Sequence, residues 1–329
     1  MRFRFGKFLD DYFQSFSALD KSPNHLTRII WYFRSKVNPS WALKGKEHLD
    51  RFISANSLPA SSDLEPFLCP EIEILIVCKS SDSDLLINCI SHAYNQSENP
   101  VSLISIIVPN DEIHQMASLF LGLNLGARVQ ILSEDEFIST SAKKLILEIR
   151  PDRFGWILQQ ILVCNFLLRT KAQYVLVVDA DTLILRKQIW VDKNERQILM
   201  SSLEFHKPYY DFLKSQSELF GTPKESFISH HMLFQTRYFQ IMMNLLGVNS
   251  EQFLERALAF SSKEEASPFD LKYEPYAQYM LRNHRDLINL TKWSNFSLKK
   301  SLGIDVAGQL NGQLSEPARY NSLSLHHWS

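Results

Sequence analysis

Between Glu71 and Asp181 the chain alternates short apolar runs with longer segments, and this alternation limits the folds open to it. The runs EIEILIV, VSLISIIV, ARVQILS and YVLVV are short and nearly continuously hydrophobic, as strands buried on both faces are. The segments between them, such as DSDLLINCISHAY and RFGWILQQILVCNFLLRT, have the length of helices. Strands that alternate with helices predict an α/β domain with a doubly wound, mostly parallel sheet.

Two aspartates, Asp179 and Asp181, follow the fourth apolar run in YVLVVDADTLIL. Ligands of open α/β sheets bind beyond the carboxyl ends of the strands, so these side chains are predicted to lie at a ligand site. On an extended backbone, residues two apart project to the same face, and two carboxylates there suit Mg²⁺ or Mn²⁺ bound to a diphosphate. The alternative is an acidic turn in which Asp179 hydrogen-bonds locally.

Composition and missing motifs narrow the classes of partner. A net charge of −1 gives no field that would draw the whole chain to nucleic acid, so no nucleic-acid partner is expected. The sequence has no GxGxxG after its first strand and no GxxxxGK[ST], which disfavours a dinucleotide-binding domain and a P-loop NTPase. None of the four cysteines forms a CxxC pair, which favours buried thiols in a reducing compartment.

The chain is predicted to have two parts, a helical N-terminal extension over residues 1–66 and a catalytic domain over residues 67–329. No apolar run reaches the roughly 18 to 20 residues of a membrane span, and the first residues lack the pattern of a secretory signal. A cytoplasmic location is therefore expected. The basic, aromatic N-terminal helices could lie on the inner face of the membrane, but their periodicity favours packing on the main domain.

The stretch RFGWILQQILVCNFLLRTKAQYVLVVDADTLIL resembles the core of GT-A type nucleotide-sugar glycosyltransferases. More closely, it resembles a little-characterised bacterial branch that carries a GWxxQQ helix ahead of a DAD strand. The segments ISHHMLF and EPYAQYM fit the same resemblance, which extends from Glu71 to about Arg282. It implies a GT-A sheet, a divalent cation (Mn²⁺ or Mg²⁺) at the D-x-D motif and a nucleoside-diphosphate sugar as donor. One departure is Val163, near where a lysine is expected after the glutamine pair.

Several residues are predicted to bind the metal and the donor. Asp181 is expected to hold the cation with help from Asp179. The resemblance to glycogenin-like enzymes implies that a late histidine completes the metal site. His326 or His327 could be that residue, with His327 preferred, and the alternative is a frayed terminus. Arg153 is predicted to hold the diphosphate and Gln160 a hydroxyl, unless this segment only packs its helix.

Two further residues are predicted to act on the acceptor. Glu274 is the candidate general base if the enzyme inverts, with Asp270 as its competitor. The alternative for Glu274 is an acidic residue that only helps to start a helix. His231 is expected to bind acceptor hydroxyls or donor phosphate, with His230 as its neighbour, although a histidine next to a core strand is often structural.

The predicted function is that of a metal-dependent glycosyltransferase that moves a sugar from a nucleoside-diphosphate donor to a hydroxyl of a glycan or lipid-linked acceptor. By analogy its role lies in surface polysaccharide or glycan biosynthesis. One alternative is a nucleotidyltransferase acting on sugar phosphates, which the lack of a glycine-rich segment after the first strand disfavours. The other is a catalytically inactive GT-A-like subunit that binds a partner.

Overall fold

The computed structural model describes residues 69–120, 126–202, 205–221, 223, 225–261, 268–299 and 321–326. The predicted helical extension, residues 1–66, lies outside the described residues, and so does any membrane contact it would make. No helix in the described ranges has the length and apolarity of a membrane span.

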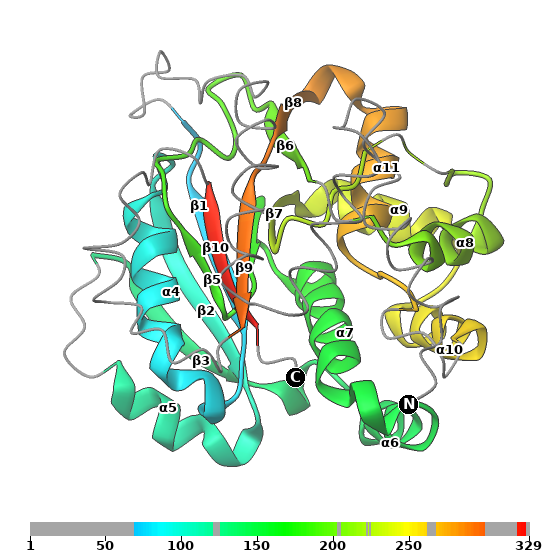
Figure 1. Cartoon of the computed structure of the whole chain (residues 1–329), viewed down its shortest axis with the longest axis horizontal. Coiled ribbons are helices and arrows are strands. Elements are labelled where there is room, and N and C mark those ends of the chain that lie inside the picture. Colours follow the sequence, from blue (N-terminus) through cyan, green and yellow to red (C-terminus); the bar gives the residue numbers. More distant parts are fainter. Residues whose placement is uncertain are drawn as a thin grey trace, which may run out of the picture.

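A five-stranded sheet forms the centre of the fold (Figure 1). Its strands lie in the order β3-β2-β1-β4-β7, and all pair in parallel except β7, which runs antiparallel to β4. The strands are β1 (Ile72–Val77), β2 (Val101–Val108), β3 (Arg128–Ser133), β4 (Tyr174–Val178) and β7 (His231–Gln235). This mostly parallel sheet is the predicted one and fits a GT-A-like fold.

Helices cover both faces of the sheet, because successive strand residues feed two separate cores. Ile74 and Ile76 of β1 belong to one core, while Leu75 between them belongs to the other. Figure 1 shows two helices on one side of the sheet, α4 (Ser83–Asn95) and α5 (Ile113–Leu119). The other side carries α6 (Thr140–Ile149), α7 (Phe154–Arg169), α9 (Thr236–Leu245), α10 (Ser250–Phe260) and α11 (Tyr273–Asn283).

Two smaller sheets and one more helix complete the described fold. The first sheet has the order β5-β10-β9, with β5 (Thr182–Ile184), β10 (Ser322–His326) and β9 (Asn295–Lys299). In it β10 runs antiparallel to β5 and parallel to β9. The second sheet pairs β6 (Gln197–Ser201) with β8 (Ile288–Lys292), and α8 (Lys207–Gln216) follows β6.

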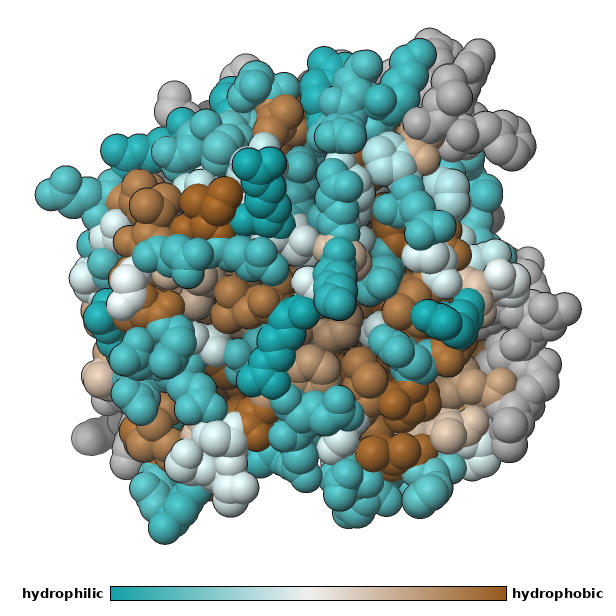
Figure 2. All heavy atoms as spheres, turned by 180° about the vertical axis from the view of Figure 1, so that it is seen from behind, coloured by the Kyte–Doolittle hydropathy of each residue, from teal (hydrophilic) through white to brown (hydrophobic). Residues whose placement is uncertain are grey.

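The outer face is mixed in polarity. Figure 2 shows the molecule from behind, with hydrophobic side chains in patches that hydrophilic side chains interrupt. In the described part of the chain the exposed large hydrophobic residues, Leu147, Leu245 and Phe260, lie on or at the ends of three different helices. Single exposed apolar side chains are ordinary on a folded domain, so we assign them no role.

Candidate active site

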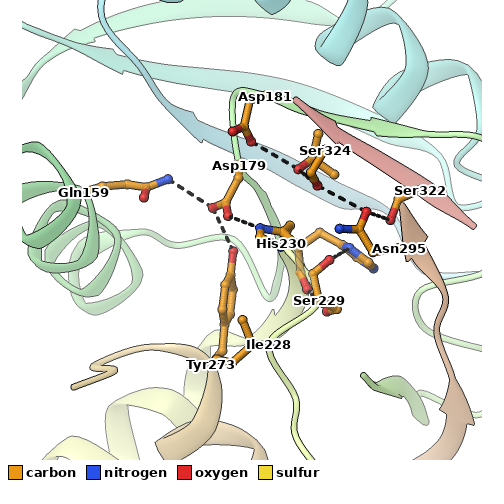
Figure 3. Close-up of polar contacts among 12 residues, drawn as sticks. Gln159, Asp179, Asp181, Ile228, Ser229, His230, Tyr273, Asn295, Ser322 and Ser324 are labelled. Carbon is orange, nitrogen blue, oxygen red and sulfur yellow. Dashed lines mark hydrogen bonds and ion pairs between the residues drawn. The ribbon is translucent and has the colours of Figure 1, made fainter. Parts of the chain in front are cut away.

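The two aspartates lie in a turn and not on an extended strand. β4 ends at Val178 and β5 begins at Thr182, and the Thr182 N–H donates to the Asp179 carbonyl oxygen at 3.0 Å, which closes the turn. The expectation that both carboxylates leave one face of an extended strand is therefore wrong, because a turn lies between them. Figure 3 shows the two carboxylates directed to different partners. The turn does stand where predicted, after the fourth strand in chain order.

Asp179 accepts four hydrogen bonds from side chains of three separate segments, and Figure 3 shows those from Gln159, His230 and Tyr273. Its Oδ1 accepts from the Gln159 amide at 3.0 Å, the Lys272 ammonium at 3.2 Å and the Tyr273 hydroxyl at 3.2 Å. Its Oδ2 lies 3.2 Å from Nδ1 of His230. Burial on its own would raise the pKa of Asp179, but the Lys272 charge and the His230 hydrogen bond outweigh it and hold that pKa well below its ordinary value. Asp179 is thus a charged carboxylate that is stabilised by hydrogen-bond donors of the protein in place of water.

His230 has a strained backbone at this site. Its φ is 63°, in the left-handed region that a non-glycine residue seldom adopts. The conformation lets its carbonyl accept from the Asp179 N–H at 2.9 Å while its ring reaches the Asp179 carboxylate. Such strain costs of order 1–3 kcal/mol and persists where surrounding contacts impose it, often at functional sites.

Asp181 has different hydrogen-bond partners from Asp179. The residue is partly exposed, and its Oδ1 accepts from the Thr182 hydroxyl at 3.3 Å. Its carbonyl accepts from the Leu325 N–H at 2.9 Å, so β10 runs along the turn. Beneath it, the buried Ser324 hydroxyl lies 2.8 Å from that of Thr182 and 3.2 Å from Oδ1 of Asn295. The described chain ends at His326, and the predicted ligand His327 lies outside it.

Gln160 does not meet the acidic turn, whereas its neighbour Gln159 does. The Gln160 side chain is 1% exposed, and its Oε1 accepts from the Leu271 N–H at 2.8 Å. It therefore ties α7 to the segment before α11. Arg153 stands at the start of α7, half-buried, and has no hydrogen bond to either aspartate. The predicted donor-binding roles of Gln160 and Arg153 stay predictions.

His231, which was predicted to bind a ligand, lies in the core. Its neighbour His230 lies beside the acidic turn instead. The His231 Nδ1–H donates to the Ser229 carbonyl at 2.8 Å, and its ring packs 4.3 Å from Trp293 and 5.3 Å from Trp190, between ring centroids. Burial lowers the pKa of His231 to about 3, so the ring is neutral at physiological pH. The structure does not bring His231 to Asp179 or Asp181.

Glu274 is fully buried in the first turn of α11. Its Oε1 accepts from the Tyr210 hydroxyl at 2.8 Å, the Ser226 hydroxyl at 2.9 Å and the Phe227 N–H at 2.8 Å, while Oε2 has no hydrogen-bond partner among the described residues. Burial raises the pKa of Glu274 to about 7. Asp270, also buried, accepts from the Glu274 N–H at 2.6 Å, and burial raises its pKa to about 6. These contacts anchor α11, and the base role of Glu274 stays a prediction.

The acidic turn suits a cation that keeps part of its water shell. Among the described residues no group of three His, Cys, Asp or Glu side chains could hold a metal ion. Mg²⁺ and similar ions commonly need one or two carboxylates plus substrate phosphates, and the turn provides that number. Asp181 fits the role better, because Asp179 already accepts four donors, one of them an ammonium. The donor set therefore fits a hydrated divalent cation on Asp181.

Sequence reasoning missed Lys272 and Tyr273, although a signal for the lysine was present. The segment PFDLKYEPYAQYM places one ammonium between apolar residues just before a helix. A lysine that is buried in such a position needs a carboxylate partner to keep its charge. The sequence already contained an acid without an assigned partner, Asp179. For Tyr273 we find no comparable signal, because aromatic residues at helix starts usually pack the core.

The chain matches one family model and is similar to solved structures. Residues 79–299 match the family described as "Family of unknown function (DUF6492)". No curated protein matches the chain. The crystal structure of mouse xyloside xylosyltransferase 1 in its apo form is similar with a TM-score of 0.40 and 10% sequence identity, over 77% of this chain and 97% of that one. A TM-score of 0.40 is too low to support an inference about function. The functional proposal below therefore depends on the sheet and the acidic turn.

Proposed function

We propose that this chain, which belongs to the family of unknown function DUF6492, is a metal-dependent glycosyltransferase with a nucleoside-diphosphate sugar as donor. The observation that carries the proposal is the Asp179–Asp181 turn. It follows β4 of a mostly parallel sheet, at the edge where such sheets bind ligands. Both aspartates are partly exposed, and Asp179 already accepts from the Lys272 ammonium, so Asp181 is our candidate to hold a cation.

In this proposal Asp181 holds the divalent cation, and the cation neutralises charge on the diphosphate leaving group when bound. The protein's own part is to keep the carboxylate in place. The Leu325 N–H fixes the Asp181 backbone from β10, and the Thr182 hydroxyl meets its carboxylate. The acceptor hydroxyl attacks the anomeric carbon, the bond from that carbon to the diphosphate oxygen breaks, and the hydroxyl proton passes to a base or to water. We propose a glycan or lipid-linked sugar as the acceptor, by analogy with the resembling enzymes.

The rival nucleotidyltransferase function gains no support from the loop after β1. In that loop the Ser80 N–H and hydroxyl both donate to the Glu112 carboxylate, at 2.5 Å and 2.9 Å. A loop that cradles phosphate would need this N–H for the ligand, and the carboxylate would repel an anion. The other alternative is an inactive binding subunit. The release assay described next distinguishes it from an enzyme.

The test is release of nucleoside diphosphate from a panel of UDP-, GDP-, ADP- and dTDP-sugars, with Mn²⁺ and with EDTA. Water can serve as a poor acceptor, so the assay does not require the natural one. We expect Mn²⁺-dependent release from one donor class and a loss of at least a hundredfold in Asp181→Asn, with the fold intact by circular dichroism. Equal release by Asp181→Asn, or none from any donor, would contradict the proposal.

A further inference from the structure

We infer that Cys89 of α4 is a positioning residue for the acidic turn, because its thiol holds the main chain that carries Asp179 and Asp181. The inference deepens the proposed function and rests on it, since it names what keeps the proposed cation-binding turn in place. Two observations carry it: the contacts of the thiol with both ends of the turn, and a second contact from the same face of α4 to β5. Cys89 acts through the turn and not on the ligand.

The Cys89 thiol lies against the main chain where the turn begins and where it ends. Its Sγ is 3.1 Å from the carbonyl oxygen of Thr182 and 3.4 Å from that of Asp179. The Asp179 carbonyl also accepts from the Thr182 N–H at 3.0 Å, which is the hydrogen bond that closes the turn. A thiol has one S–H, which at this position can donate to either carbonyl. The thiol therefore supports the two residues whose main-chain contact defines the turn.

The thiol keeps its proton, as a donor must. Cys89 is fully buried, and burial together with the negative charges of Asp181 and Asp179 raises the pKa of its thiol well above the ordinary value. A thiolate here would be repelled by the two carboxylates of the turn. The S–H is thus present throughout the physiological pH range.

A second residue on the same face of α4 holds the strand that follows the turn. His92 comes three residues after Cys89, so the two side chains leave the same side of the helix. The His92 Nδ1–H donates to the Ile184 carbonyl at 2.9 Å, two residues beyond Thr182 in β5. One face of α4 therefore contacts three main-chain carbonyl oxygens in the short segment that contains the turn and β5.

Two elements that are remote in sequence thus hold the main chain of the turn. α4 supplies the Cys89 thiol, and β10 supplies the Leu325 N–H, which donates to the Asp181 carbonyl. Groups that bind a ligand must be held within about 0.5 Å of their productive positions, and the residues behind them do this. Without the Cys89 donor the carboxylates occupy a wider range of positions, so a ligand that needs them binds more weakly.

The experiment uses inorganic pyrophosphate with Mn²⁺ as the probe, because the donor base and sugar are not identified. Calorimetry measures pyrophosphate affinity, and urea denaturation measures the free energy of unfolding of each variant. We compare the wild type with Cys89→Ala and Cys89→Ser, which are similar in volume and differ by one hydroxyl donor. Ile90→Val is the matched control, because Ile90 is fully buried in the same core on the same helix, and its shortening removes a methylene group and no donor.

We expect Cys89→Ala to weaken pyrophosphate binding at least fivefold, Cys89→Ser to restore it to within twofold of the wild type, and Ile90→Val to leave it unchanged. Cys89→Ser as weak as Cys89→Ala overturns the inference, because the volume of the sulfur and not its donor would then matter. Equal weakening in Ile90→Val also overturns it, because binding would then follow the stability of the whole domain. If Cys89→Ala does not fold, Cys89→Val takes its place, since valine fills the space and has no donor.

The outcomes also separate the inference from the proposed function. Wild-type protein that binds pyrophosphate with Mn²⁺, together with Cys89→Ala of equal affinity, overturns the inference and leaves the proposed function standing. Wild-type protein that binds no pyrophosphate with Mn²⁺ present overturns the proposed function and the inference with it.

Discussion

Two acids of this protein, the partly exposed Asp179 and the buried Glu274, show how the chemistry of the partner decides the charge of a carboxyl group. Asp179 and Glu274 each accept at least three hydrogen bonds, yet the pKa of Asp179 falls and that of Glu274 rises to about 7. The partners of Asp179 include the Lys272 ammonium, whereas those of Glu274 are two hydroxyls and an amide N–H. Neutral donors alone do not offset the burial of a full charge.

The raised pKa of Glu274 predicts a specific dependence of stability on pH. The unfolded chain releases this proton near the ordinary pKa of 4.5, while the folded chain keeps it up to about 7. The stabilisation is therefore complete below pH 4.5 and lost as pH rises through 7, a change on the order of 3 kcal/mol. Glu274→Gln removes it, so the free energy of unfolding of the wild type relative to this variant should fall between pH 5 and pH 8. Urea denaturation at both values measures the difference.

Glu274→Gln also distinguishes the anchoring role of Glu274 from the predicted catalytic one. If its contacts describe its whole function, the variant should release nucleoside diphosphate within tenfold of the wild-type rate. A general base contributes about 10²–10⁴-fold to a rate. A hundredfold drop in turnover with an intact fold would therefore restore Glu274 as the base.

The strained backbone of His230 predicts that glycine at this position changes the free energy of unfolding little but weakens ligand binding. His230→Gly relieves a left-handed conformation worth about 1–2 kcal/mol and loses the contact with Asp179, so its free energy of unfolding should stay within about 1 kcal/mol of the wild type. Pyrophosphate binding should nevertheless weaken.

His231→Ala, which empties a core position, should lower the free energy of unfolding by about 2–4 kcal/mol. Denaturation of the two variants side by side checks this, and a larger loss in His230→Gly would contradict it.

At the scale of single residues, the structure brings to Asp179 the chain neighbours of two residues that the sequence singled out, Gln160 and His231. In the pair Gln159–Gln160 and the pair His230–His231, the first residue meets Asp179 and the second packs inward. Helix α7 is apolar on most sides, so its sequence shows no polar face that would single out Gln159. For the histidines, the left-handed backbone conformation of His230 decides which ring faces the site. The sequence has no glycine at that position, so nothing in it indicates this conformation.

At the scale of elements, the acidic turn depends on a strand from the far end of the chain. β10 supplies the Leu325 N–H to Asp181 and the buried Ser324 hydroxyl to Thr182. The sequence predicts the elements that flank the turn, because strands and helices up to β4 carry clear hydrophobic patterns. It did not predict β10, since SLSLH alone does not distinguish a frayed terminus from a strand, and its pairing with β5 spans roughly 140 residues.

The contact between β10 and the turn predicts that Ser324→Ala loosens the site. Ser324 is fully buried, and alanine leaves the Thr182 hydroxyl and the Asn295 amide oxygen each one partner short, at a cost of about 1–2 kcal/mol. Urea denaturation measures this loss, and Mn²⁺ affinity should fall with it because Thr182 also meets Asp181. Ser141→Ala, an exposed serine on α6, is the control. Unchanged stability and metal affinity in Ser324→Ala would show that β10 does not support the site.

At the scale of the whole molecule, one sheet separates two cores, and side chains that alternate along its strands feed both. The alternation of strands and helices made this α/β architecture predictable. The strand order and the antiparallel direction of β7 were not, because they depend on which strands pair across long stretches of chain. The position of the acidic turn followed from the architecture, whereas the partners of each carboxylate required coordinates.

All four cysteines of the chain are buried, and Cys78, Cys89 and Cys164 lie in the two cores. None of the four forms a disulfide, and burial raises the pKa of the Cys89 and Cys164 thiols. We therefore expect Ellman's reagent to react negligibly with the native protein and with four thiols per chain once guanidinium chloride unfolds it. Fast reaction of the native protein with any thiol would contradict the packing described here.

The central claim is that the Asp179–Asp181 turn is where the cation and the donor's diphosphate bind. Anomalous diffraction at the manganese edge, from crystals soaked with Mn²⁺ and pyrophosphate, tests it most directly. We predict a manganese peak within bonding distance of an Asp181 carboxylate oxygen, with pyrophosphate density beside it. Pyrophosphate and manganese bound elsewhere, with no peak at Asp181 in a crystal that leaves the turn accessible, would contradict the account.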